Sequence, residues 1–202
     1  GAHDAVMLGF KPQQLGELAP GLQSLTGEGV TIYSLLAGLT VAQLSSAFPE
    51  ASAHIRVMPN LASRINKSPI ILLEEGLDDA GRAAAFALFD RLGTALWLEE
   101  EAKFDLVTAL AGSGPGFVYR FIDALAEAAS DLGLDAEQAT SLALATVDGA
   151  SSQAAGSDVS PGELADQVAS PGGMTREGMN VLDADKALVN LLNSTLTATR
   201  DR

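Results

Sequence analysis

The first 98 residues alternate short apolar runs with helical stretches, and this alternation leaves few folds open to the chain. The apolar runs are AVMLGF (5–10), VTIYSLL (30–36), HIRVMPN (54–60), PIILLEE (69–75) and TALWLEE (94–100). Near-continuous apolar strands separated by helices are typical of a parallel sheet that is covered on both faces. The helices between them are expected at residues 12–25, 40–48 and 78–92. Residues 1–98 are therefore predicted to form an α/β domain.

After Glu101 the strand pattern stops and only helical spacing remains. Apolar residues recur at helical spacing up to Leu132, and Gly133 is expected to end that helix. Further helices are predicted at residues 135–155, 161–168, 174–183 and 185–200. Residues 99–202 are therefore predicted to be an all-helical domain, and the fold class is α/β followed by all-α.

Composition excludes several functions before any motif is considered. The formal net charge of −14 disfavours binding to nucleic acid or to an anionic membrane, since both need clustered Lys and Arg. The chain has no cysteine and only two histidines, so disulfides, thiolate chemistry and a histidine-rich metal site are excluded. No run is apolar and long enough to cross a bilayer, which predicts a soluble protein. The lack of cysteine fits a location in the cytoplasm.

Three successive strands are followed by turns of similar chemistry: Lys11-Pro12, Ala37-Gly38 and Pro59-Asn60. In an open parallel sheet, ligands bind in the crevice beyond the carboxyl ends of the strands. Small residues at these turns leave room for a flat ring, and Asn60 offers both a donor and an acceptor. The alternative is that proline and glycine only terminate the strands.

The stretch GSGPGF (112–117) does not meet the dinucleotide fingerprint, because Phe117 occupies the place of the third glycine. If the first domain is a dinucleotide fold, its opening strand and phosphate loop are expected upstream of Gly1. Ser113 is a candidate helix N-cap, and Pro115 suits the first helical turn. A bend between two helices and a substrate clamp are both compatible with this stretch.

A second stretch, SPGGMT (170–175), also places Ser, Pro and Gly ahead of a predicted helix. Helix N-termini attract carboxylates through unpaired N–H groups and a partial positive charge. A small acid could therefore bind at Thr175 and its neighbours in spite of the acidic composition.

Taken together, these motifs resemble those of the pyrroline-5-carboxylate reductase family. The matching stretches are KPQ (11–13), AG (37–38), RVMPN (56–60), VTALAGSGPGFVY (107–119), GL (133–134), GA (149–150) and VASPGGMT (168–175). They cover nearly the whole chain in family order. The resemblance implies a Rossmann domain followed by a helical dimerisation domain, often within a decamer, and NADPH- or NADH-dependent reduction of 1-pyrroline-5-carboxylate to L-proline.

The resemblance also implies roles for particular residues. Those expected to border the nicotinamide are Lys11, Pro12, Ala37, Gly38 and Asn60. Those expected to bind the substrate are Ser113, Gly114, Asp158, Ser170, Gly172, Gly173, Met174 and Thr175, mainly through backbone N–H groups around its carboxylate. Thr108 and Ser113 are expected beside the reacting ring as the candidate catalytic residues, and no metal is expected.

Some residues depart from the family pattern. The chain has MPNLA for the usual MPNTP, LAGSGPG for LSGSGPA, Met174 where Thr or Ala is common, and Asp158 where many relatives have Glu. The family's N-terminal GxGxM loop is not found in these 202 residues, so impaired cofactor binding and activity are expected for this stretch of chain.

Two other functions stay open at this point. A non-catalytic dimeric module could use the carboxylate pocket to sense proline or a related acid. A hydroxyacid dehydrogenase of similar plan is a third reading, but no candidate catalytic Lys or His lies on the opening helices of the second domain.

Overall fold

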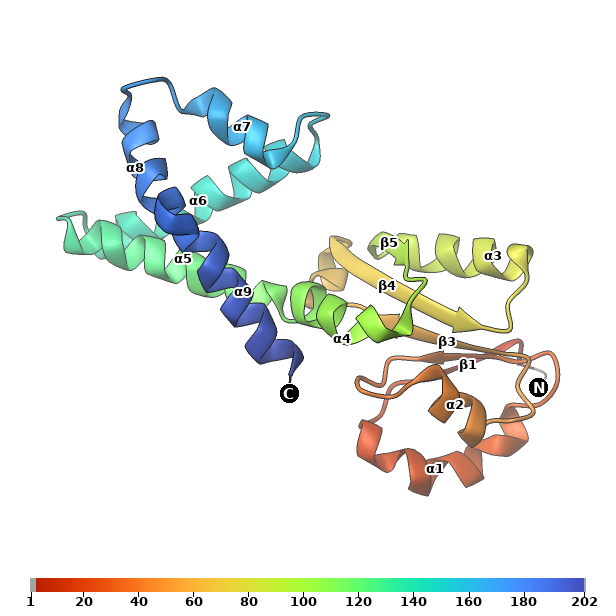
Figure 1. The fold of residues 1–202 in the computed structure, drawn as a ribbon. Helices are drawn as coiled ribbons and strands as arrows, with labels where there is room; N and C mark the ends of the chain where they lie inside the picture. The colour runs from red at the N-terminus through yellow and green to blue at the C-terminus, as the bar shows by residue number, and fades with distance from the viewer. Residues whose placement is uncertain (1–2, 202) are drawn as a thin grey trace. The chain divides into compact units, whose positions relative to one another are not determined.

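The computed structural model describes residues 3–201 and divides into two compact units, Gly1–Pro115 and Gly116–Arg202. The first unit is an α/β layer structure and the second consists of helices (Figure 1). The domain boundary predicted at residue 98 marks the end of the strand pattern, whereas the division after Pro115 separates two compact units. The boundary at residue 98 stays a prediction.

The first unit is built on a five-stranded sheet in the order β1-β2-β3-β4-β5. Its strands are β1 (Ala5–Leu8), β2 (Thr31–Ser34), β3 (Ala53–Met58), β4 (Ser68–Glu75) and β5 (Gly93–Trp97). Each of them falls within or next to a predicted apolar run. Three of the four pairings are parallel, and β3 and β4 run antiparallel. The sheet is therefore mostly, but not wholly, the parallel sheet that the sequence predicts.

The antiparallel pairing follows from the length of the connection between the two strands. Only residues 59–67 join β3 to β4, and they hold the short 3₁₀ helix η3 (Leu61–Ile65). A parallel crossover needs a dozen or more residues, usually including an α-helix. The chain therefore turns back beside β3. From β4 to β5, by contrast, α3 (Asp79–Asp90) supplies a full crossover and the strands are parallel.

Helices cover both faces of the sheet, as the apolar strands predict. The elements α1 (Leu15–Leu22) and α2 (Val41–Ala47) lie on one face, and α3 lies on the other (Figure 1). Along β4, Ile70 and Leu72 pack in the cluster that contains Phe89 of α3, while the alternate residues Ile71 and Leu73 pack with Phe104. Burying a side chain of this size contributes about 1.5–3 kcal/mol each.

The chain leaves β5 through η4 (Glu101–Lys103), α4 (Phe104–Val107) and η5 (Thr108–Gly112), which is a π-helical turn. The helices that follow are α5 (Gly114–Asp131), α6 (Ala136–Ala155), α7 (Pro161–Val168), α8 (Met174–Asp183) and α9 (Ala187–Arg200). Gly133, with φ of 110°, ends α5 as expected. The last helix begins two residues later than predicted, because Asp185 and Lys186 take left-handed φ angles of 51° and 58°.

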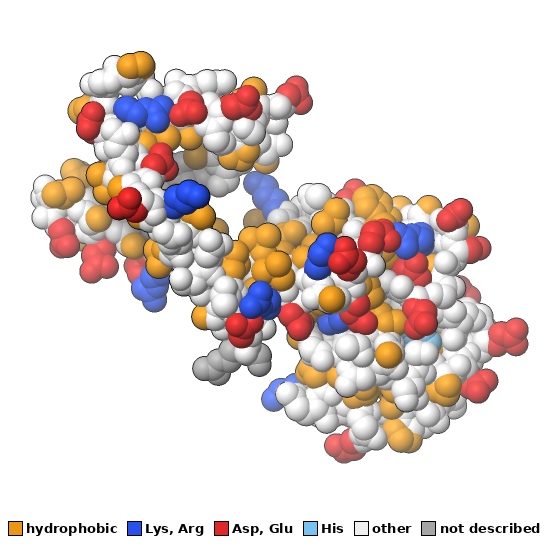
Figure 2. Space-filling model, viewed as in Figure 1, with side chains coloured by type: hydrophobic (Ala, Val, Ile, Leu, Met, Phe, Trp, Pro, Cys, Tyr) orange, Lys and Arg blue, Asp and Glu red, His pale blue; other side chains and the backbone are white. Residues whose placement is uncertain are grey.

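The helices of the second unit leave many large apolar side chains at the surface. Among its described residues, the fully buried hydrophobic side chains are Ala126, Ala139, Ala143 and Ala169. Phe121, Leu132 and Val181 are exposed by 51%, 91% and 72%. Figure 2 shows such side chains among acidic ones on these helices. Exposed apolar area of this extent marks an interaction surface.

We predict that Gly93→Ala destabilises the first unit by about 3 kcal/mol, because a β-carbon at Gly93 would lie 2.1 Å from the carbonyl oxygen of Ser68 in the next strand. Gly16→Ala is the matched control, since nothing lies within 4 Å of its added carbon and it sits in α1. This control should be neutral or slightly stabilising. Urea unfolding of both variants measures the difference, and equal effects would contradict the steric account.

Candidate active site

Three predicted cofactor turns lie at one edge of the sheet. The strands β1, β2 and β3 are mutually parallel neighbours, with Leu8, Ser34 and Arg56 in register. Their carboxyl ends therefore point the same way, and the turns after them lie side by side. This edge holds Lys11, Pro12, Ala37, Gly38 and Asn60. The topology thus brings the three turns together, as the sequence predicts. Their role in binding a nicotinamide ring stays a proposal.

The turn after β2 gives the edge an open floor. Gly38 has φ of 75°, a conformation that favours glycine, and nothing lies within 4 Å of the position its β-carbon would take. Pro12 begins the short helix η1 (Pro12–Gln14), and the Lys11 amide donates to the side chain of Gln14 at 3.1 Å. A flat group could therefore approach the backbone here.

The backbone N–H and both ends of the side-chain amide of Asn60 form hydrogen bonds that fix its position. Its backbone N–H donates to Ser68 Oγ at 2.8 Å, and its Oδ1 accepts from the Ala62 amide at 2.8 Å. Its Nδ2 donates to the carbonyl oxygen of Ala111, 51 positions later in the chain, at 2.8 Å. The end of β3 is thereby tied to the π-helical turn that contains Thr108.

A buried ion pair lies beneath the same edge. Arg56 on β3 is only 4% exposed, and its Nη1 donates to Glu101 Oε1 at 2.9 Å. The same oxygen accepts the N–H of Val41, the first residue of α2, at 2.8 Å. The guanidinium carbon lies 3.5 Å from the centroid of the Phe104 ring. Burial lowers the pKa of Arg56, and the bond and charge of Glu101 act against that lowering.

This ion pair was not predicted from the sequence, although a signal for it was present. A charged residue within an apolar strand run, as in HIRVM, is almost never fully buried unless it has a partner. The identity of that partner was not readable, because Glu101 lies 45 positions away among the acidic residues 99–101. His54 on the same strand is also buried, and its Nε2 lies 2.9 Å from the Phe48 carbonyl oxygen, so it has a packing role.

Ser113 in the GSGPG stretch does not have the backbone conformation of a helix N-cap. Ser113 has helical φ and ψ of −87° and −18°, and its amide donates to the Thr108 carbonyl at 3.1 Å. An N-cap residue has non-helical dihedrals, so the predicted capping role of Ser113 is wrong. Instead a π-turn passes into α5 at Gly114. Single π-turns of this kind occur frequently at functional sites.

The bend at 170–175 in the second unit has the geometry of a type II turn. Gly173 N–H donates to the Ser170 carbonyl at 2.9 Å, with Pro171 and Gly172 between them and φ of 71° at Gly172. Gly173 then precedes α8, whose first-turn amides include those of Met174 and Thr175. These N–H groups have no acceptor within the helix. The bend therefore presents donors that suit a carboxylate.

The other predicted substrate residues are accessible in this unit. Met174 is 93% exposed, and Asp158 is exposed in the connection from α6 to α7. Arg176 in α8 donates to Asp166 Oδ1 at 2.8 Å and to the Ala169 carbonyl at 3.3 Å, which ties the first turn of α8 to the end of α7. A pocket shared by this bend and the Ser113-Gly114 segment stays a prediction.

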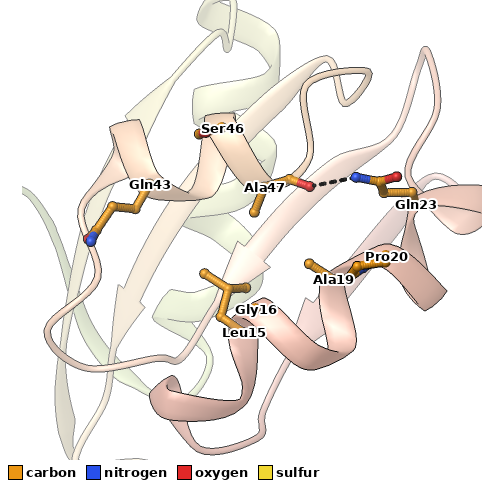
Figure 3. Close-up of a pocket in the computed structure, with 8 residues that line it drawn as sticks. All are labelled: Leu15, Gly16, Ala19, Pro20, Gln23, Gln43, Ser46 and Ala47. Atoms are coloured by element: carbon orange, nitrogen blue, oxygen red, sulfur yellow. Dashed lines mark hydrogen bonds between the residues drawn. The ribbon is translucent and has the colours of Figure 1, made fainter.

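A surface groove of the first unit lies elsewhere. It has a volume of about 400 Å³ and lies between α1 and α2. Figure 3 shows the residues that line it, with the Gln23 amide bonded to the Ala47 carbonyl across one end. None of the predicted site residues lines it. Volume alone does not identify the site here, and the convergent polar groups at the sheet edge are the better guide.

Two features are absent from residues 3–201. In that range, no cluster of three His, Cys, Asp or Glu side chains is placed to hold a metal ion. Within the same residues, no helix combines the length and the apolar character needed to cross a membrane.

Fold and surface together define a class: a Rossmann-like α/β unit followed by a helical unit whose exposed apolar side chains mark an interaction surface. Comparison with known proteins identifies the family. Residues 101–202 match the family described as pyrroline-5-carboxylate reductase dimerisation. The chain is 37% identical to pyrroline-5-carboxylate reductase 2 of Bacillus subtilis over 198 residues, covering 95% of this chain and 70% of that protein. The chain belongs to the pyrroline-5-carboxylate reductase family.

Solved structures agree with that assignment. A pyrroline-5-carboxylate reductase from Coxiella burnetii superimposes with a TM-score of 0.92 at 32% identity, over 98% of this chain and 74% of that one. The pyrroline carboxylate reductase of Plasmodium falciparum, solved with NADP bound, gives a TM-score of 0.83 at 24% identity, over 98% and 75%. At 24% identity, the similarity to the Plasmodium falciparum structure shows the fold alone.

We predict that Glu101→Ala destabilises the first unit by about 2–3 kcal/mol, because it leaves the Arg56 charge buried without its partner. This value lies below that for a fully buried pair, since the Glu101 side chain is 35% exposed. The neighbouring Glu100→Ala is the control: Glu100 pairs with Lys103 at the surface and should cost less than about 1 kcal/mol. Urea unfolding separates the two, and a similar loss in both variants would contradict the role of burial.

Proposed function

We propose that the intact protein reduces the C=N bond of 1-pyrroline-5-carboxylate to give L-proline, the last step of proline biosynthesis, with NADPH or NADH as reductant. The observation that carries the proposal is the extent of the match: similarity to a named reductase covers 95% of the chain, the α/β unit as well as the helical one. The sensor alternative is not favoured, because the relatives are named as reductases.

The geometry suits a reaction that needs orientation more than acid–base catalysis. The carbon of a ring iminium is already electrophilic, so the protein's task is to hold it at the right distance and angle. The first-turn amides of α8, together with Ser170, Gly172, Gly173, Met174 and Thr175, would bind the substrate carboxylate. Thr108, Ser113 and Gly114 would border the ring, and Asp158 would lie near its nitrogen.

The cofactor would supply a hydride, and the carboxyl edge of the sheet has features that suit its nicotinamide ring. The free space above Gly38 admits a flat ring, and Lys11, Pro12, Ala37 and Asn60 would border it. Weak dinucleotide binding by the 202 residues alone remains the expectation, because they contain no G-x-G-x-x-G stretch.

The protein is proposed to act as a homodimer through its helical unit, which matches a dimerisation family and exposes large apolar side chains. Assembly of dimers into a decamer belongs to the same proposal. A location in the cytoplasm is supported by the absence of cysteine from the sequence.

The test of the activity is NADPH oxidation by the intact protein with 1-pyrroline-5-carboxylate, followed at 340 nm, with formation of proline measured in parallel. Equal assays with small 2-oxo acids serve as the specificity control. Turnover of the oxo acids without turnover of the cyclic imine would refute the assignment.

We predict that Gly172→Ala raises the KM for pyrroline-5-carboxylate at least tenfold, since φ of 71° at this position disfavours a side chain and the turn that presents the amides would shift. The KM for NADPH should change less than threefold. Gly162→Ala is the matched control, because Gly162 lies in α7 with nothing within 4 Å of the added carbon. Initial-rate kinetics measure both KM values. An unchanged KM for the substrate in the Gly172 variant would show that the substrate carboxylate does not bind at this turn.

A further inference from the structure

The carbonyl of Ala111 lacks its α-helical hydrogen-bond donor, because the residue that would supply the N–H is a proline. The backbone continues in helical conformation from α4 through η5 and Ser113 into α5. In an α-helix this carbonyl would accept from the N–H four residues later, and that residue is Pro115, which has none. The proline of the GSGPG stretch thus removes a donor from a part-buried helical segment.

Asn60 supplies the missing donor from another element. Its Nδ2 lies 2.8 Å from the Ala111 carbonyl oxygen. The opposite end of the same amide is occupied, because Oδ1 accepts from the Ala62 N–H at 2.8 Å. That second bond determines which end of the amide faces Ala111. The MPN and GSGP motifs therefore form one hydrogen-bonded unit.

We infer that Asn60 is a positioning residue that holds the π-helical turn Thr108–Gly112 against the carboxyl edge of the sheet. The segment from Glu101 to Ala111 is fixed at both ends: Glu101 binds Arg56 and Val41, and Ala111 binds Asn60. Thr108 lies between the two anchors. Its distance from the turns after β2 and β3 is therefore set by these bonds. This inference rests on the proposed function for its catalytic consequence.

The consequence is an effect on the rate of reaction more than on cofactor affinity. Displacing a substrate-positioning segment by about 1 Å can lower a rate a hundredfold. Direct contact with the cofactor alone would instead raise the KM for NADPH. The two roles of Asn60 are thus separable by kinetics.

Two substitutions at Asn60 remove the donor and keep the acceptor for Ala62. Asn60→Ser retains a good cap but is too short to reach Ala111, and Asn60→Asp places a carboxylate oxygen against the carbonyl. Pro115→Ala restores an N–H four residues after Ala111. The carbonyl then has a helical partner that does not involve Asn60.

A double-mutant cycle on unfolding tests the clamp without cofactor or substrate. Asn60→Ser is expected to raise the unfolding equilibrium constant of the chain about tenfold, and less than threefold in the Pro115→Ala background. Should Asn60→Ser fail to fold alone, folding of the double variant is the expected rescue. An equal effect of Asn60→Ser in both backgrounds, or no rescue, would overturn the inference.

Kinetics of the intact protein test the consequence. Asn60→Asp is expected to lower kcat at least tenfold with the KM for NADPH changed less than threefold. Pro115→Ala is not expected to restore the kcat lost in Asn60→Ser, because Ala111 is then satisfied within the helix but the helix is still not tied to the sheet. Gln23→Glu is the control for the amide-to-acid change, since Gln23 also donates to a backbone carbonyl but at the surface. A raised KM for NADPH with kcat retained would overturn positioning. Inactive wild-type protein would instead refute the proposed function and leave the unfolding cycle to stand.

Discussion

The buried guanidinium of Arg56 is the constraint on which the first unit depends. A charge in an apolar sheet needs a partner, and Glu101 reaches it from the segment that follows β5. The same carboxylate binds the Val41 amide at the start of α2. One ion pair therefore joins strand β3, helix α2 and the path towards α4. The turns after β2 and β3 and the segment that contains Thr108 adjoin these three elements, so this ion pair helps to set their spacing.

The second unit depends on a different constraint, the lack of large side chains in its own core. Alanines such as Ala139 and Ala143 let α5 and α6 approach closely, but they bury little apolar area. The larger residues, Leu132 and Val181 among them, face outwards. Such helices gain stability by covering these faces with another chain, which agrees with their match to a dimerisation family.

Local patterns predicted the elements well, and they failed where a distant residue decides the outcome. Apolar runs located the five strands to within a few residues at each end, and helical spacing placed α7 and α8 at their observed bounds. The antiparallel turn of β4, the helical backbone of Ser113 and the partner of Arg56 were not predicted. The first depends on a connection length, the second on a π-turn, and the third on contact between residues 45 positions apart. None of these leaves a periodic signal.

Asn60 and Pro115 affect the same backbone carbonyl, that of Ala111, so the two motifs that contain them depend on each other. Proline at position 115 removes a donor, so by itself it weakens the helix that contains Thr108. An amide side chain from the end of β3 replaces that donor, and the helix gains a fixed position relative to the sheet. An ordinary residue at 115 would satisfy Ala111 locally and leave the two elements independent. The missing N–H thus makes the helix depend on the sheet, which suits a site that works through orientation.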